Sequence, residues 1–280
     1  MNTCLKHLVV GIDVGSSRTK AVAYEGSKIV AMKTIENGDI SKTAQAILKL
    51  VLAETQVRSE ELKQVALSGS GRSRLAPDTF IGLPVTMVDE IRAIGLGGLE
   101  LSEKQHALIV SMGTGTALVV ASDGGRKIEH VGGTGVGGGT IEGLSRRVLG
   151  VEMFEEAEKM AFRGKTSNVD LIVSDLTLDS VGMLPKYATA SNFKKLDVKS
   201  QKDDVAAAIF NMVSEVIGIV TVMAAKAFHC EEEVVLTGKL AQSKKIVERI
   251  DSVTELFKIR ISVQTNCEYC VAIGAAKSVI

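Results

Sequence analysis

The hydrophobic residues of the chain alternate between short apolar runs and longer stretches with helical spacing. Near the start, three apolar runs predict strands, and a turn of glycine and serine residues joins the first two. These predicted strands are Leu8–Asp13, Thr19–Tyr24 and Lys28–Glu36. Apolar residues then recur at helical spacing from Ala44 to Leu52, which predicts a helix capped by Ser41. A buried strand at Gln64–Ser68, ending in a second glycine turn, completes a βββαβ order.

The second half of the chain repeats this plan. A short strand at Val85–Asp89 and a helix beginning at Glu90 close the first half. Strands are then expected at Ala107–Met112, Ala117–Ala121 and Ile128–Val131, the first two again joined by a glycine turn. Two copies of one plan predict an α/β fold of two similar lobes, residues 1–103 and 104–280, each with a βββαβα order, on either side of a nucleotide cleft.

The remaining elements of the second lobe follow from the same patterns. We expect a loop at Thr189–Phe193. The further predicted elements are helices at Glu152–Met160, Asp203–Phe228, Ser243–Arg249 and Tyr269–Val279, and strands at Glu233–Thr237 and Arg260–Gln264. Polar residues such as Asn211 and Glu215 interrupt the longest apolar stretch, so it is interpreted as a buried amphipathic helix and not as a membrane span.

Composition and charge narrow the class of protein. The chain has 280 residues with 33 Lys plus Arg and 33 Asp plus Glu, so its formal net charge is zero. This balance favours neither nucleic acid nor anionic lipid as a partner. No secretory leader is recognised, and four cysteines are too few for a disulfide framework. We therefore expect a soluble cytoplasmic protein, in which the single CxxC at Cys267 and Cys270 is only a weak indication of zinc or redox chemistry.

Glycine is the unusual feature of the composition, with 27 residues against 3 prolines. Three strands run into turns of small residues, and a fourth glycine-rich segment precedes a predicted helix. Such turns let the backbone approach a phosphate and direct several N–H groups at it, although one turn alone is often only a turn. The candidate phosphate-binding residues are Gly15, Ser16, Ser17, Gly113, Thr114, Gly115, Thr116, Gly135, Gly137, Gly138, Gly139 and Gly238.

Two carboxylates and one lysine are the candidate reactive groups. Asp13 ends the first strand at a glycine turn, where it could bind Mg²⁺ beside phosphates or simply hydrogen-bond its own turn. Lys20 lies near the same turn and could offset phosphate charge. Glu90 could accept a proton from an alcohol that attacks a phosphoryl group, with Asp89 as the alternative base, or it could be an ordinary first-turn glutamate. No histidine pairs with a Ser or Cys in a triad pattern.

At these residues the sequence resembles the type II pantothenate kinases, members of the superfamily of acetate and sugar kinases, chaperone ATPases and actin. The segments that carry the resemblance are GIDVGSSRTKAVAY, VSMGTGTAL, VGGTGVGGGTIEGL, SNVDLIV, TASNF, VVLTG and EYCVAIGA. The resemblance implies a two-lobed actin-like (ribonuclease H-like) fold. It also implies transfer of a phosphoryl group from ATP, with Mg²⁺, to the primary hydroxyl of pantothenate, the first step of coenzyme A biosynthesis.

The same resemblance implies roles for individual residues. Glu90 corresponds to the catalytic base, Asp13 to the first-turn aspartate near the metal, and Thr114 to a hydroxyl residue that faces the substrate. Gly135–Gly139 and the TASNF residues Ser191, Asn192 and Phe193 are implied to bind the nucleotide. The family is dimeric, with Asp203–Phe228 as the expected interface helix.

One position departs from the family pattern, because His130 stands where an arginine that helps to hold pantothenate is usual. The alternatives are a kinase of a related pantothenate-like alcohol, an ATPase that activates a 2-hydroxyacyl-CoA dehydratase, and a nucleotide-binding homologue without catalysis.

Overall fold

The computed structural model describes residues 8–76, 79–177, 182 and 184–280. They form two compact units. The first unit takes its residues from 1–109, 119–131 and 263–280, and the second from 110–118 and 132–262. Cys4 and His7, which the sequence analysis considered among the cysteines and histidines, lie outside the described residues.

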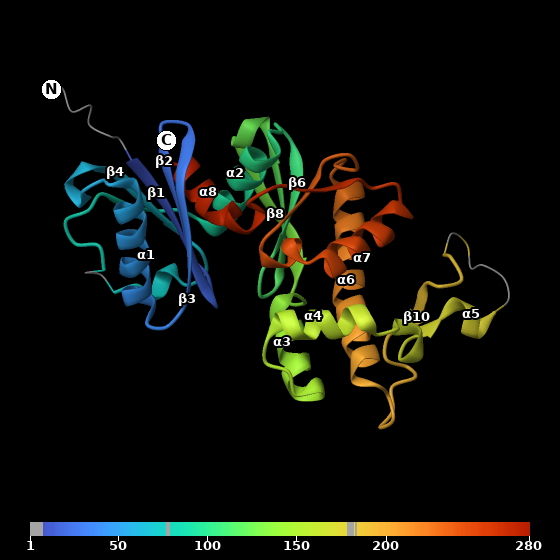
Figure 1. Cartoon of the computed structure of the whole chain (residues 1–280). Coiled ribbons are helices and arrows are strands. Elements are labelled where there is room, and N and C mark those ends of the chain that lie inside the picture. Colours follow the sequence, from blue (N-terminus) through green and yellow to red (C-terminus); the bar gives the residue numbers. More distant parts are fainter. Residues whose placement is uncertain (1–7, 77–78, 178–181, 183) are drawn as a thin grey trace. The chain divides into compact units, whose positions relative to one another are not determined.

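The first unit contains a five-stranded sheet with the order β3-β2-β1-β4-β5 (Figure 1). Strand β1 pairs antiparallel with β2 and parallel with β4, so it lies in the middle of the sheet. The strands are β1 (Leu8–Val14), β2 (Arg18–Glu25), β3 (Lys28–Glu36), β4 (Leu62–Ser68) and β5 (Val85–Met87). The predicted strands of this part of the chain are confirmed.

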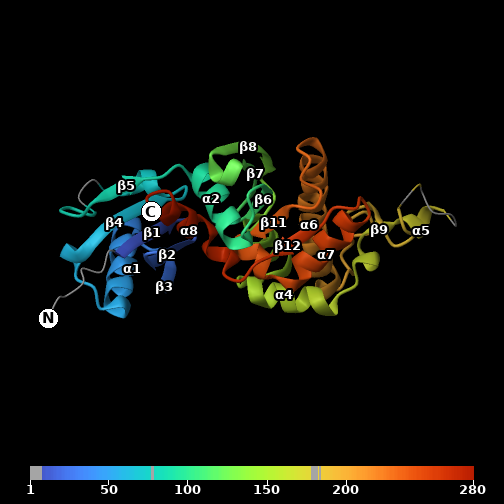
Figure 2. The ribbon, with the colours of Figure 1, turned by 90° about the horizontal axis from the view of Figure 1, so that it is seen from above.

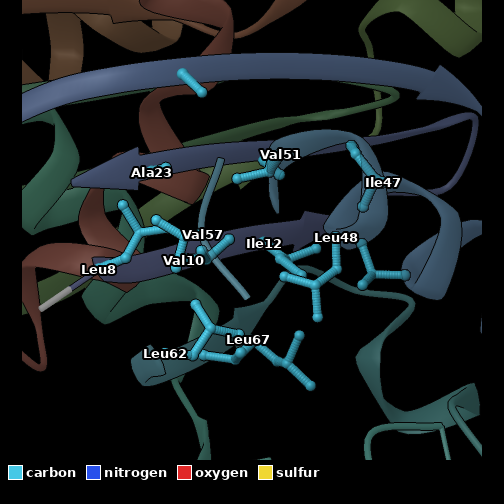
Figure 3. Close-up of a cluster of buried hydrophobic side chains, with 14 residues drawn as sticks. Leu8, Val10, Ile12, Ala23, Ile47, Leu48, Val51, Val57, Leu62 and Leu67 are labelled. Carbon is cyan, nitrogen blue, oxygen red and sulfur yellow. The ribbon is translucent and has the colours of Figure 1, made fainter. Parts of the chain in front are cut away.

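Helix α1 (Ile40–Thr55) covers one face of this sheet. Leu8, Val10 and Ile12 project from alternate positions of β1 into a core that also contains Ile47 and Val51 of the helix (Figure 3). The sequence predicted β1 from its continuous apolar run, and every residue of the strand is buried.

The predicted cap of α1 is wrong by two residues. The N-cap is Asp39, whose side chain accepts a hydrogen bond from the Lys42 N–H at 2.9 Å. The Ser41 hydroxyl instead accepts one from the Ala76 N–H, also at 2.9 Å, so a distant segment decides its partner.

Helices α2 (Glu90–Ser102) and α8 (Cys270–Lys277) pack closely in the first unit. A Cβ atom at Gly97 would lie 1.9 Å from the Cys270 carbonyl oxygen, and one at Gly274 would lie 1.8 Å from that of Ala93. Glycine at both positions therefore permits the contact. Because α8 also packs on β1, the last residues of the chain belong to the first unit (Figure 2). The structure thus divides the chain differently from the expected ranges 1–103 and 104–280.

A second five-stranded sheet has the order β12-β11-β6-β7-β8. Its strands are β6 (Ala107–Met112), β7 (Thr116–Ser122), β8 (Lys127–Thr134), β11 (Val234–Thr237) and β12 (Ile261–Val263). Read from β8, the order matches that of the first sheet, strand for strand along the sequence. The predicted duplication is therefore confirmed.

The helices of the second unit lie between β8 and β12 in the sequence. They are α3 (Gly138–Leu144), α4 (Phe154–Arg163), α5 (Val173–Leu176), α6 (Lys202–Ala227) and α7 (Lys244–Glu255). Helix α6 packs against α4 and α7 (Figure 1). By length and composition α6 could cross a membrane, but 72% of its most apolar 18-residue stretch is buried, as a core helix requires.

The loop expected at Thr189–Phe193 is partly wrong, because Thr189–Ser191 form the short strand β10. It pairs antiparallel with β9 (Leu171–Ile172). Neither strand is long enough to leave a periodic pattern in the sequence, so only their pairing shows them.

Candidate functional site

A row of polar side chains crosses the first sheet at the end of β1. Lys20 and Ser68 are both register partners of Asp13, on either side of it, and neighbours in register project from the same face of a sheet. Lys20 Nζ lies 3.6 Å from Asp13 Oδ2. The Ser68 hydroxyl is fully buried and has no hydrogen-bond partner among the described residues. Sequence analysis identified Asp13 and Lys20 but missed Ser68, which looked like an ordinary strand residue.

Asp13 is buried and closely packed. Burial raises the pKa of its carboxyl, and the nearby Lys20 ammonium acts in the opposite direction. A Cβ atom at Gly69 would lie 2.4 Å from Asp13 Oδ1, so only glycine leaves room beside this carboxylate. Asp13 is therefore a buried carboxylate, closely packed against Gly69 with Lys20 as its charged neighbour.

Glu90 lies near Asp13. It is the first residue of α2, and the Asp89 side chain caps this helix by accepting hydrogen bonds from Ile91 and Arg92 N–H at 3.0 and 3.1 Å. Partial burial raises the Glu90 pKa, and the charge of Asp13 raises it further. Because Asp89 is occupied with the cap, Glu90 is the better candidate for a base.

The turn Gly15–Ser17 is held by a residue that the sequence analysis missed. Asn37 Nδ2 donates to the Gly15 carbonyl oxygen at 2.8 Å, and Asn37 Oδ1 accepts a hydrogen bond from the Thr19 hydroxyl at 2.7 Å. Ser16 and Ser17 are exposed at the tip of this turn. The turn therefore exposes two serine residues, while the Asn37 side chain holds its backbone through the hydrogen bond to Gly15.

In the second unit, the structure brings together three glycine segments that are separate in the sequence. Gly138 and Gly139 N–H donate to the Gly113 and Thr114 carbonyl oxygens at 2.8 and 2.9 Å. A Cβ atom at Gly137 would lie 2.6 Å from the Thr114 oxygen, and one at Gly238 would lie 2.4 Å from the Met112 oxygen. The glycines thus allow the backbones of these segments to approach closely.

At least four N–H groups in this cluster already donate hydrogen bonds within the second unit. Besides those of Gly138 and Gly139, the Gly113 N–H donates to the Gly115 carbonyl oxygen at 2.9 Å and the Gly137 N–H to the Thr140 hydroxyl at 3.2 Å. The sequence analysis expected the amides that lead into the next helix to bind an anion, but those of Gly138 and Gly139 hold the two loops together. Thr116 adds a hydrogen bond from its hydroxyl to the Val136 carbonyl oxygen at 2.9 Å. Any phosphate would have to be bound by other groups of these loops, such as the exposed residue Gly135.

Ser191, Asn192 and Phe193 lie in another part of the second unit. Ser191 and Asn192 line a cavity of about 470 Å³ with residues of α6 and α7, and none of the glycine-cluster residues lines it. Asn192 Nδ2 donates to Glu215 Oε2 at 2.9 Å, and Glu215 is paired with Arg249. The structure therefore does not place the TASNF segment with the glycine cluster.

A buried aspartate anchors this segment. Asp170 is fully buried and accepts hydrogen bonds from the Phe193 N–H at 2.8 Å and from Asn211 Nδ2 at 2.9 Å. Phe193 has a φ of 59°, a left-handed conformation that is unusual for a residue other than glycine. Asp170 thus satisfies the backbone at a strained position. In the sequence, this aspartate stands out only as part of the motif SNVDLIV.

Other candidates are more exposed or lack a cluster. His130 is an exposed residue of β8. Cys230, Cys267 and Cys270 are buried free thiols. Within the described ranges, no group of three or more His, Cys, Asp or Glu side chains could hold a metal ion. Mg²⁺, however, is commonly bound by one or two carboxylates together with substrate phosphates and water. Asp13, with the unpartnered Ser68 hydroxyl beside it, fits such a site.

On the helix that was expected to form a dimer interface, the apolar residues Ile219 and Met223 are exposed, at 36% and 65%. Val216, Ile219 and Val220 line the cavity described above. The homodimer stays a prediction.

The fold defines the class of protein. The chain contains two α/β sheets of the same strand order. A buried aspartate lies at the end of β1 in the first sheet, and the glycine cluster includes the turn after β6 in the second. This is the actin-like architecture found in kinases and ATPases. A solved structure of this architecture is the activator of the 2-hydroxyisocaproyl-CoA dehydratase from Clostridium difficile with bound ADPNP. It is 18% identical, covers 96% of this chain and 92% of its own, and has a TM-score of 0.69. The expected fold class is confirmed.

Sequence comparison identifies the family. The family model Fumble matches residues 99–258, and the chain belongs to this family. The type II pantothenate kinase of Oceanobacillus iheyensis is 27% identical over 277 residues, covering 96% of this chain and 98% of that enzyme. The type II pantothenate kinase of Bacillus cereus is 25% identical over 256 residues, covering 88% and 89%. The resemblance drawn from the motifs is confirmed.

Proposed function

We propose that this protein is an ATP-dependent kinase that phosphorylates the primary hydroxyl of pantothenate. The curated relatives are named type II pantothenate kinase, and this chain aligns with nearly their whole length. A solved structure of the same fold contains an ATP analogue. The observation that carries the mechanism is Glu90, a half-buried carboxylate near Asp13 at the start of α2. Its position and its raised pKa suit a general base that takes the proton of an attacking alcohol.

The proposed roles are proton transfer, metal binding, nucleotide binding and acceptor binding. In the first unit, Glu90 accepts the hydroxyl proton and Asp13 holds Mg²⁺, which when bound offsets the charge of the nucleotide phosphates. In the second unit, the glycine cluster at 113–116, 135–139 and 238 contacts the nucleotide through its backbone. Thr114 and His130 contact the acceptor. Binding of the nucleotide by Ser191–Phe193 stays a prediction, as does a location in the cytoplasm.

The decisive variant is Glu90→Gln, because the amide keeps the shape of the side chain and cannot accept the proton. We expect kcat with pantothenate to fall by about 10²- to 10⁴-fold while the affinity for ATP changes little. The matched control is Glu103→Gln, an exposed glutamate at the far end of the same helix, which should leave kcat unchanged. Residual activity of Glu90→Gln within a few fold of the unaltered protein would assign the base elsewhere.

The pH profile gives a second readout. Because a base must be unprotonated to act, and because the Glu90 pKa is raised, the acid limb of kcat/KM should lie above the ordinary value of 4.5. Activity should be lost as the pH falls through this limb.

A second function is an ATPase that drives a partner enzyme, favoured by the fold shared with the dehydratase activator. Anaerobic iron analysis of the purified protein distinguishes the two. An iron–sulfur cluster in stoichiometric amount, with no phosphorylated product from pantothenate, would support the activator and reject the kinase.

A further inference from the structure

Arg72 lies in a short turn that is fixed against the end of β1. The turn, Arg72–Arg74, follows β4 after the glycines Gly69 and Gly71. Gly71 N–H donates to the Val14 carbonyl oxygen at 2.8 Å, and a Cβ atom at Gly71 would lie 2.9 Å from that oxygen. The backbone that carries Arg72 is thus held beside the residue that follows Asp13.

One hydrogen bond sets the direction of the guanidinium group. Arg72 Nη1 donates to the Gly69 carbonyl oxygen at 3.1 Å. Gly69 is also the residue that faces the Asp13 carboxylate. The Arg72 side chain is 30% exposed, and its charge acts on the carboxyl of Glu90. A cation is therefore held at the site of the proposed base.

The remaining donors of Arg72 have no acceptor among the described residues. The closest carboxylate oxygen, Asp89 Oδ2, is 4.0 Å from Nη2, which is too far for a hydrogen bond, and the other Asp89 oxygen caps α2. Arg163 shows the contrast, because two of its nitrogens donate to Asp203 at 2.7 and 2.9 Å. Arg72 thus keeps a partly buried fork of donors that can take a planar or tetrahedral oxyanion.

We propose that Arg72 binds an oxyanion of a substrate at the Glu90 site. Two oxyanions of the reaction fit this chemistry, the carboxylate of the acceptor and the γ-phosphoryl group of ATP. The assignment rests on the proposed kinase function for the identity of these groups. It requires only that the fork donates two hydrogen bonds to one oxyanion, with no covalent step.

The test compares Arg72→Met and Arg72→Lys with pantothenate and with pantetheine, which has the same primary hydroxyl and no carboxylate. Arg74→Met, an exposed arginine of the same turn, is the matched control and should behave like the unaltered protein. Urea unfolding of each variant checks that the fold is kept. Arg72→Lys keeps the charge without the fork, so it remains informative if Arg72→Met is unstable.

Each outcome supports or overturns the assignment. If the acceptor carboxylate is the ligand, kcat/KM for pantothenate falls about 10- to 100-fold in Arg72→Met and that for pantetheine stays within about threefold. If the γ-phosphoryl group is the ligand, kcat falls by a similar factor for both acceptors, and added guanidinium ion restores part of it. Equal kinetics of Arg72→Met and Arg74→Met with both acceptors would overturn the proposal.

Binding measurements separate this proposal from the proposed function. Calorimetric titration with pantothenate and with a non-hydrolysable ATP analogue needs no turnover. If the unaltered protein phosphorylates neither acceptor but binds one of these oxyanions, and Arg72→Met loses that binding, the kinase function fails and the role of Arg72 stands. Unchanged binding of both ligands by Arg72→Met would refute the role of Arg72 alone.

Discussion

Replacing Gly69 by alanine should damage both the stability of the first unit and the site around Asp13. Gly69 has a φ of +91°, and an added Cβ atom would lie 2.4 Å from Asp13 Oδ1 and 2.6 Å from the Val14 carbonyl oxygen. A residue with a Cβ atom in a left-handed conformation costs about 1–2 kcal/mol. Forcing an atom into a closely packed site adds about 1–3 kcal/mol. The expected loss for Gly69→Ala is therefore about 2–5 kcal/mol in the free energy of unfolding.

A matched control isolates the clash. Gly26 has a φ of +62° and nothing within 4 Å of an added Cβ atom. Gly26→Ala should therefore cost only the backbone term of about 1–2 kcal/mol. Urea unfolding followed by circular dichroism measures both variants. Kinase activity gives the functional half of the prediction, since only Gly69→Ala pushes on the Asp13 carboxylate and should lower kcat. Equal stability of the two variants would show that the Gly69 contact is not what the structure indicates.

Two further predictions concern buried groups. Asp170→Asn should lower the free energy of unfolding by about 1–3 kcal/mol, because one end of the amide cannot accept the hydrogen bond from Phe193 N–H or from Asn211; a loss below about 0.5 kcal/mol in urea unfolding would contradict this account. Burial raises the pKa of Cys230 and of Cys267 to about 11. At pH 8, therefore, only about one in a thousand of these thiols is ionised, whereas about a quarter of ordinary thiols are. Peptide mass spectrometry after iodoacetamide treatment should show both cysteines labelled far more slowly in the native protein than in urea, with native labelling accelerating as the pH rises towards 11; equal rates would be inconsistent with the structure.

The strands and long helices could be predicted because they leave local patterns. β1 is a short continuous apolar run, and the apolar stretch within α6 is too long for anything but a helix. The cap of α1 was harder, because Asp39 and Ser41 are both good capping residues and the Ala76 N–H decides between them. The pairing of β9 with β10 could not be predicted, because strands of two and three residues leave no local pattern in the sequence.

The candidate site shows the same division. Asp13 could be found from the sequence because it ends an apolar strand at a glycine turn, and Glu90 because it begins a helix after a short strand. Their proximity, and the place of Arg72 beside them, depend on β1, β4 and α2 being packed in one unit. Ser68 had no signal of its own, since a buried serine in a strand is ordinary until its hydroxyl is found without a partner.

By itself, then, the sequence determined the duplicated βββαβ order, the glycine turns and the family, since each of these is written in residues that are close along the chain. The tertiary structure decided which unit the last helix joins, which glycine N–H groups are already bonded, and which charges meet at Glu90. The physical reason is that burial, desolvation and hydrogen-bond partners are set by residues distant in sequence, and no local pattern of side chains carries that information.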